Sequence, residues 1–110
     1  MAVMIQERRA SERVRANLPA YWEGVLVSRE GMVSDLSTTG CFVVTKAEVQ
    51  PKELIRLEIE METGRRLYLW GEVVYHMDEI GFALRFTGTE EPEQNMLEAL
   101  IEFVRSRDEE

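Results

Sequence analysis

The chain has 110 residues, of which 45% are hydrophobic and 31% are charged, and its formal net charge at pH 7 is −8. This length fits one domain that buries about two thirds of its unfolded surface, and the composition excludes a disordered chain. The acidic balance argues against binding to DNA or RNA, and the sequence has no apolar run long enough to insert into a membrane.

The beginning of the chain differs from the rest in charge. Residues 1–20 carry four arginines against Glu7 and Glu12, which gives a net charge of +2, whereas residues 21–110 carry a net charge of −10. A basic segment on an acidic protein indicates a small anionic ligand that is held locally rather than a long polyanion.

The arginine-rich segment extends from Arg8 to Arg15. We interpret it as a mobile arm, preceded by a tail at residues 1–6 and ending near Pro19, because the residue before a proline disfavours a continuing helix. The planar guanidinium group binds phosphate oxygens and base edges through paired hydrogen bonds. Arginines four residues apart are also typical of a solvated helical turn, so the sequence leaves both interpretations open.

Six short β-strands are predicted between residues 20 and 86. Their signals are runs of β-branched, aromatic or alternating apolar residues that are bounded by turn-forming residues. The alternation is clearest from residue 55 to residue 62, where every second side chain is apolar and those between are charged. The predicted strands cover residues 20–27, 32–36, 41–45, 55–62, 66–77 and 82–86, and the first predicted turn covers residues 28–31.

The long fifth strand is predicted to place Leu67, Tyr75 and the alternate residues between them on one face. Gly71 within it indicates a bulge or a close approach of another backbone. His76, near the end of this strand, is expected at the surface or at an edge. Cys41 stands in an apolar run, so we expect a buried thiol, and a lone cysteine fits a reducing cytoplasm without an internal disulfide.

A C-terminal helix is predicted from about Glu91 to Arg105. Leu97, Leu100, Ile101 and Val104 follow the spacing of one helical face, and acidic residues gather at the N-terminal end. The predicted fold class is therefore mainly β: a six-stranded antiparallel β-barrel with a C-terminal α-helix as a lid and a flexible N-terminal arm. We expect one domain over residues 7–106, with an acidic tail at residues 107–110.

The segment Asp35-Leu36-Ser37-Thr38-Thr39-Gly40 is a cluster of turn-forming residues between the second and third predicted strands. Asp35 and Ser37 should project from the same side of an extended segment, since they are two residues apart. Gly40 allows a positive φ or the close approach of a ligand. The segment is a candidate binding site, although an ordinary turn has the same composition.

Two motifs now stand in order: Arg9-x-x-x-Arg13 on the predicted arm and Asp35-x-Ser37-x-x-Gly40 at a barrel turn. In this order and separation they resemble the PilZ domain, a bacterial family of receptors for cyclic di-GMP. Residues 71–75 and 80–86 are similar to late strands of that family. The resemblance extends over nearly the whole chain and implies the barrel with a C-terminal helix.

The resemblance also implies a binding site for cyclic di-GMP, which has two phosphates and two guanines. Arg9 and Arg13 would bind phosphates and guanine edges, and Asp35 would accept hydrogen bonds from guanine N1 and N2. Ser37 would add a polar contact and Gly40 would shape the turn. Arg8 resembles the arginine that accompanies binding of an intercalated ligand pair. The expected ligand-binding residues are Arg8, Arg9, Arg13, Asp35, Ser37 and Gly40.

The implied mechanism is the closing of the arm over the nucleotide, after which a downstream protein partner reads the changed surface. No cofactor or metal is expected, because the sequence has no Cys/His cluster. An enzyme is not expected either, since Ser37 lacks a nucleophile-elbow pattern and His76 is the one histidine. The remaining alternative is a PilZ-fold interaction adaptor without nucleotide, for which Trp22, Tyr68 and Trp70 offer either an exposed patch or barrel packing.

Overall fold

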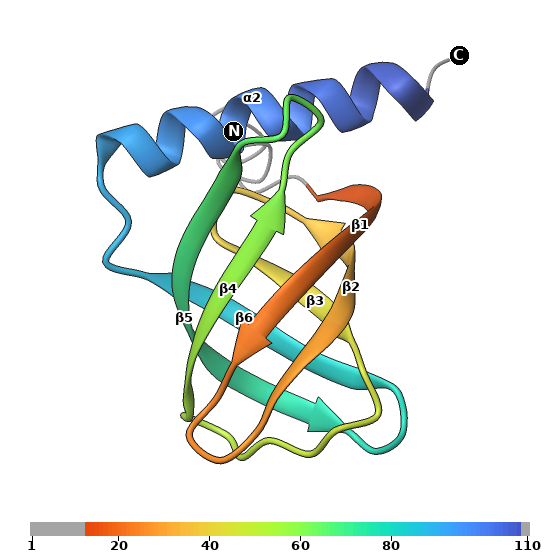
Figure 1. The fold of residues 1–110 in the computed structure, drawn as a ribbon, viewed down its shortest axis with the longest axis vertical. Coiled ribbons are helices and arrows are strands. Elements are labelled where there is room, and N and C mark those ends of the chain that lie inside the picture. Colours follow the sequence, from red (N-terminus) through yellow and green to blue (C-terminus); the bar gives the residue numbers. More distant parts are fainter. Residues whose placement is uncertain (1–12, 109–110) are drawn as a thin grey trace, which may run out of the picture.

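The computed structural model describes residues 13–108, and Arg8, Arg9 and the tail at residues 1–6 lie outside them. The described chain forms six strands and a helix that follows them. All strand pairs are antiparallel, and they close into a barrel in the order β1-β2-β3-β6-β5-β4 (Figure 1). The predicted fold class is confirmed. The elements are β1 (Val14–Glu23), β2 (Ser28–Leu36), β3 (Gly40–Val44), β4 (Leu54–Glu60), β5 (Arg66–Met77), β6 (Gly81–Thr87) and α2 (Glu91–Asp108).

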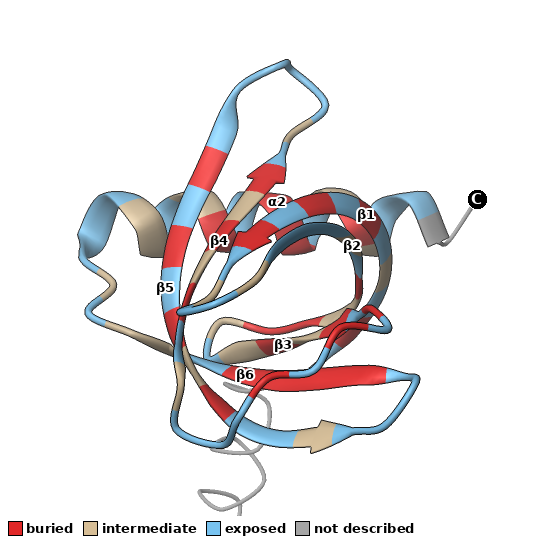
Figure 2. Ribbon diagram, turned by 60° about the horizontal axis from the view of Figure 1, so that its bottom comes forward, coloured by how far each residue is buried: buried red, intermediate tan, exposed pale blue. Residues whose placement is uncertain are grey.

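The barrel interior is a continuous apolar core. Buried residues alternate with exposed or half-buried ones along the strands, as the colour bands show in Figure 2, because successive side chains of a strand point to opposite faces. Trp22 is fully buried and meets the ring of Phe82 edge to face, with ring centroids 5.2 Å apart. Of the three candidate aromatic residues, Trp22 therefore packs inside the barrel, whereas Tyr68 and Trp70 are exposed on β5.

Helix α2 covers one end of the barrel, as predicted for a lid (Figure 1). Leu97, Leu100, Ile101 and Val104 are all buried in the core, which confirms the apolar face read from their spacing. At the N-terminal end, the Glu90 amide donates to a carboxylate oxygen of Glu93 at 2.9 Å. The helix continues to Asp108, three residues past the predicted end, so its last turn carries Arg107.

The first hairpin differs from the prediction. Strand β1 begins at Val14, not at residue 20, and the turn lies at residues 24–27, where the Gly24 amide donates to the Val27 carbonyl. Val25 and Leu26 are apolar but exposed at this turn, which made them resemble part of a strand. The end of the predicted arm, Val14 and Arg15, pairs with β2 and is part of the barrel.

A register shift in β5 corrects a second prediction. The pairing with β6 changes between Val73 and Tyr75, so one additional residue is accommodated in β5 and the alternation reverses. Leu67 and Val73 point into the barrel as predicted, but Tyr75 is exposed. Gly71 lies before the shift, and a Cβ there would approach the Leu84 side chain at 2.5 Å. Its role is therefore close packing against β6.

Candidate functional site

The Asp35–Gly40 segment connects the end of β2 to the start of β3. Strand β1 runs beside it, and the ladder pairs Arg15 with Asp35 and Val14 with Leu36. An irregularity in the β2–β3 register between Val33 and Asp35 shifts the pairing just before the turn. The segment thus lies at one end of the barrel, beside the first residues of β1.

The Ser37 side chain holds this turn together. Its hydroxyl oxygen accepts hydrogen bonds from the amides of Thr39 and Gly40, both at 3.2 Å, and it lies 3.3 Å from the Gly40 carbonyl, to which it can donate. The backbone adds a bond from the Ser37 amide to the Gly40 carbonyl at 2.9 Å. The side chain is buried, with 1% of its surface exposed. Its hydrogen-bonding capacity is therefore used inside the turn, and it is not presented as a nucleophile.

Gly40 is required by the approach of β6. It pairs with Arg85, and a Cβ built on it would lie 2.4 Å from the Leu84 carbonyl oxygen, a distance that real Cβ atoms essentially never show. Gly40 is not among the residues with positive φ. The glycine thus lets β3 close against β6, and the positive φ that the sequence allowed is not observed.

Asp35 differs from Ser37 in having no side-chain partner among the described residues. It borders an open groove of about 790 Å³ that is lined by β1, β2 and the last turn of α2. Within residues 13–108 its carboxylate forms no hydrogen bond and no ion pair. The groove residues are Arg15, Ala16, Asn17, Ser34, Asp35 and Arg107.

The charges of the groove are suited to an anion that also carries hydrogen-bond donors. Arg15 and Arg107 offer planar donor groups, and Asp35 offers an acceptor carboxylate beside them. Two arginines against one aspartate make this lining locally positive on a chain whose net charge is −8. A dianionic ligand with donor edges fits such a lining better than a simple anion, because the carboxylate would repel an anion without donors.

Arg13 stands immediately before β1 and is exposed. Its position is marked by an electrostatic effect on Cys41, the residue that follows Gly40. Burial raises the pKa of the Cys41 thiol to about 12, and the positive charge of Arg13 opposes part of that rise. The thiol is buried, as predicted, and stays protonated at neutral pH.

The structure thus gathers four of the six predicted residues, Arg13, Asp35, Ser37 and Gly40, around one turn at one edge of the barrel. Arg8 and Arg9 lie outside the described residues. Asp35 lines the groove, whereas Ser37 is buried in the turn, so the two side chains do not share one environment as the sequence predicted.

Five of the six groove residues are not among the ligand-binding residues expected from the sequence: Arg15, Ala16, Asn17, Ser34 and Arg107. Arg15 was noted as a member of the arginine-rich segment, but its position opposite Asp35 depends on the β1–β2 register. The predicted end of α2 at Arg105 left Arg107 in a tail. Only the packing of α2 on the barrel end shows where Arg107 points.

The described part of the chain has no features of a metal site or of a membrane-spanning helix. Residues 13–108 contain no group of three or more His, Cys, Asp and Glu side chains that could hold a metal ion. None of the described helices has the length and apolar character needed to cross a membrane. His76 is half-buried near the end of β5, and its Nε2 atom has no hydrogen-bond partner among the described residues.

Comparison with protein families identifies this barrel. The profile described as the PilZ domain matches residues 7–103. This chain belongs to the PilZ domain family. The match includes both motifs, and the resemblance seen in the sequence is confirmed. No curated protein sequence matches the chain significantly.

Solved structures with the same fold are similar to this PilZ chain over most of its length. The PilZ domain of CeSA from a cellulose-synthesizing bacterium is 17% identical with a TM-score of 0.71, covering 86% of this chain and 99% of that one. The PilZ domain of Escherichia coli YcgR, solved with c-di-GMP, is 17% identical with a TM-score of 0.74, covering 92% and 94%. A longer YcgR structure, also in complex with c-di-GMP, is 16% identical with a TM-score of 0.77, and this chain spans 48% of it.

Proposed function

We propose that this protein is a receptor for cyclic di-GMP and that the groove at Asp35 is where the nucleotide binds. The observation that carries the proposal is the Asp35 carboxylate, which has no partner within residues 13–108 and borders a groove with Arg15 and Arg107. Membership of the PilZ family and the similarity to PilZ structures that contain c-di-GMP support this ligand.

The chemistry of the ligand matches the groove. Each guanine presents N1–H and N2–H donors to a carboxylate and O6 and N7 acceptors to an arginine, and each phosphate accepts paired hydrogen bonds from a guanidinium. In this proposal Asp35 binds a guanine donor edge, and Arg13 and Arg15 bind phosphate or guanine acceptors. Ser37 and Gly40 contribute by fixing the turn that carries Asp35, given the hydrogen bonds and the close approach described above.

Arg8 and Arg9 complete the proposed site. In the sequence they precede Arg13 by a few residues, and Arg13 stands where β1 begins. We propose that the segment from Arg8 to Glu12 closes over the nucleotide and that a downstream protein partner reads the resulting surface. A change of state of this kind requires that the ligand interact more favourably with the closed arrangement than with the open one.

Titration calorimetry with cyclic di-GMP tests the proposal, and separate titrations with GTP and cyclic di-AMP serve as comparisons. We expect cyclic di-GMP alone to bind tightly, since only it combines two guanines with two bridging phosphates. Because a hydrogen bond to a charged group contributes about 1.5–3 kcal/mol, Arg9→Ala and Arg13→Ala should each weaken binding by about ten- to a hundredfold.

A wild-type titration without heat, repeated at several temperatures, would reject the receptor function and leave the interaction adaptor as the better description. Equal affinity of the wild type and both arginine variants would reject the assignment of the arm but not the ligand.

A further inference from the structure

We propose that Arg107, in the last turn of α2, contacts the bound nucleotide directly and thereby couples the C-terminal helix to occupancy of the groove. The inference rests on the proposed function and adds to it a ligand contact outside both sequence motifs. Arg107 lines the same groove as Arg15 and Asp35, although it is far from both in sequence. The groove is therefore formed by both ends of the described chain.

The state of the Arg107 side chain suits a ligand contact. It is exposed, and its guanidinium carbon lies 5.5 Å from the centroid of the Phe103 ring, one helical turn earlier. Within residues 13–108 it has no carboxylate partner. Stacking on an aromatic face leaves the in-plane N–H groups of a guanidinium available, so Arg107 can bind a phosphate or a guanine edge without leaving the ring.

A cation in the last helical turn has an ordinary explanation that must be separated from this one. The C-terminal end of a helix carries partial negative charge, and any cation there stabilises the helix by a small amount. That explanation requires only a positive charge, which lysine also provides. A contact through paired in-plane donors requires the guanidinium, because the lysine ammonium is a point charge without that planar fork.

The contact would connect the ligand to the part of α2 that packs on the core. Phe103 packs against the hydrophobic core, and Val104 beside it is fully buried. A nucleotide held between Asp35 and Arg107 would therefore restrain the final turn of the helix against the barrel end. The surface of that turn becomes a second place, besides the arm, where a partner could sense the ligand.

The experiment compares cyclic di-GMP affinity of the wild type, Arg107→Ala and Arg107→Lys by calorimetry. Arg29→Ala is the matched control, because it removes the same charge from an exposed position at the other end of the β1–β2 hairpin. We expect Arg107→Ala to weaken binding about tenfold or more and Arg107→Lys to weaken it several-fold, whereas Arg29→Ala should stay within about twofold of the wild type.

Amide hydrogen exchange supplies a readout specific to the helix. Ligand should slow exchange in the last turn of α2, around Phe103 and Arg107, in the wild type and in Arg29→Ala but not in Arg107→Ala. Circular dichroism of the free proteins checks that α2 remains folded in each variant.

The outcomes separate this inference from the function on which it rests. If the wild type binds no cyclic di-GMP, both are rejected. If the wild type binds and Arg107→Ala binds equally well, the receptor function stands and the helix contact is rejected. Full binding by Arg107→Lys with loss in Arg107→Ala would reduce the role of Arg107 to charge alone and would overturn the contact through paired guanidinium donors.

Discussion

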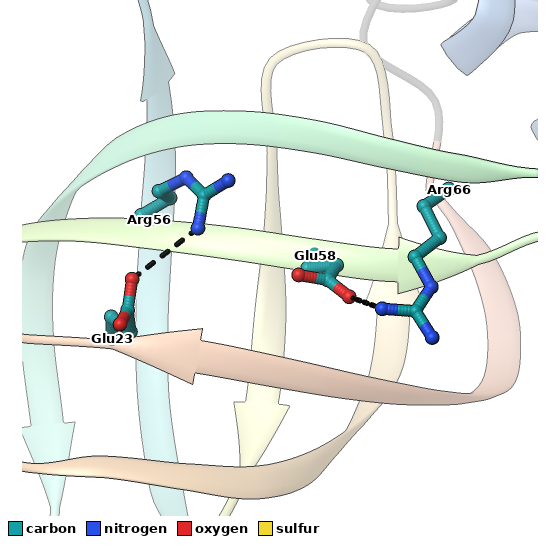
Figure 3. Close-up of polar contacts among 4 residues, drawn as sticks. All are labelled: Glu23, Arg56, Glu58 and Arg66. Atoms are coloured by element: carbon teal, nitrogen blue, oxygen red, sulfur yellow. Dashed lines mark hydrogen bonds and ion pairs between the residues drawn. The ribbon is translucent and has the colours of Figure 1, made fainter.

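Arginines at two places on the barrel surface differ in whether they form an ion pair with a carboxylate. On the outer face of β1, β4 and β5, arginines form ion pairs with glutamates. The Arg56 Nη1 atom lies 3.3 Å from Glu23 Oε1, and Arg66 pairs with Glu58 (Figure 3). The Glu58 carboxylate also raises the pKa of Arg66. These charges are paired across neighbouring strands by the register of the sheet.

At the groove the charges are not paired within the described residues. Asp35 stands opposite Arg15 in the β1–β2 ladder, yet neither side chain forms an ion pair with any residue from 13 to 108. An acidic protein offers many carboxylates that could have matched the groove arginines, as they do on β4 and β5. The unpaired charges of the groove support the proposal that Asp35 and Arg15 bind a ligand, whereas Arg56 and Arg66 have carboxylate partners on the barrel itself.

The strongest test of this comparison is the removal of the Asp35 carboxylate. Because Asp35 has no partner within residues 13–108, Asp35→Ala should leave the melting temperature nearly unchanged. It should weaken cyclic di-GMP binding about a hundredfold, since two guanine donors would lose a charged acceptor. Calorimetry and thermal melting of the same preparations measure both quantities. A large loss of stability without a loss of affinity would assign Asp35 to the fold and erase the distinction.

The turn beneath Asp35 should show the opposite behaviour. Ser37→Ala removes the oxygen that accepts from the Thr39 and Gly40 amides inside a buried turn. Unsatisfied buried donors should lower the free energy of unfolding by about 1–2 kcal/mol, with a weaker secondary loss of affinity as Asp35 becomes less well placed. Ser34→Ala is the matched control: Ser34 lines the groove, and its side chain forms no hydrogen bond within residues 13–108. Equal stability of the two variants in urea unfolding would contradict the structural role of Ser37.

The sequence predicted the fold well because its signals are local. Alternation with a period of two and the apolar face of a helix are visible within a few residues, and the structure has the strand at residues 66–77 and the helix from Glu91 as predicted. The predicted bounds of the first hairpin were wrong because Val25 and Leu26 are apolar residues in an exposed turn. The predicted inward face of Tyr75 was wrong because one additional residue in β5 reverses the alternation. Such a shift depends on the partner strand.

The candidate site was predictable only in part. The motif residues Asp35, Ser37 and Gly40 were identified from the sequence, but their different roles were not: one carboxylate faces a groove, one hydroxyl is used inside the turn, and one glycine makes room for β6. These differences arise from tertiary packing. The position of Arg107 in the groove could not be predicted for the same reason, because the local sequence does not indicate where the end of the helix packs on the barrel.

The smallest effect is expected on the paired side of the comparison, at Arg56. Its guanidinium carbon lies 4.8 Å from the centroid of the Tyr68 ring, and its ion pair with Glu23 is well exposed, with 38% and 46% of the two side chains accessible. Exposed ion pairs contribute little because water and salt screen them, so Arg56→Ala should lower the free energy of unfolding by about 0.2–1 kcal/mol.

The cyclic di-GMP affinity of Arg56→Ala should stay within about twofold of the wild type, because Arg56 does not line the groove. Urea unfolding at low and high salt, together with calorimetry, measures both effects. A loss of affinity comparable with that of Asp35→Ala would mean that the paired arginines also serve the ligand. Pairing within the barrel would then no longer separate structural charges from binding charges.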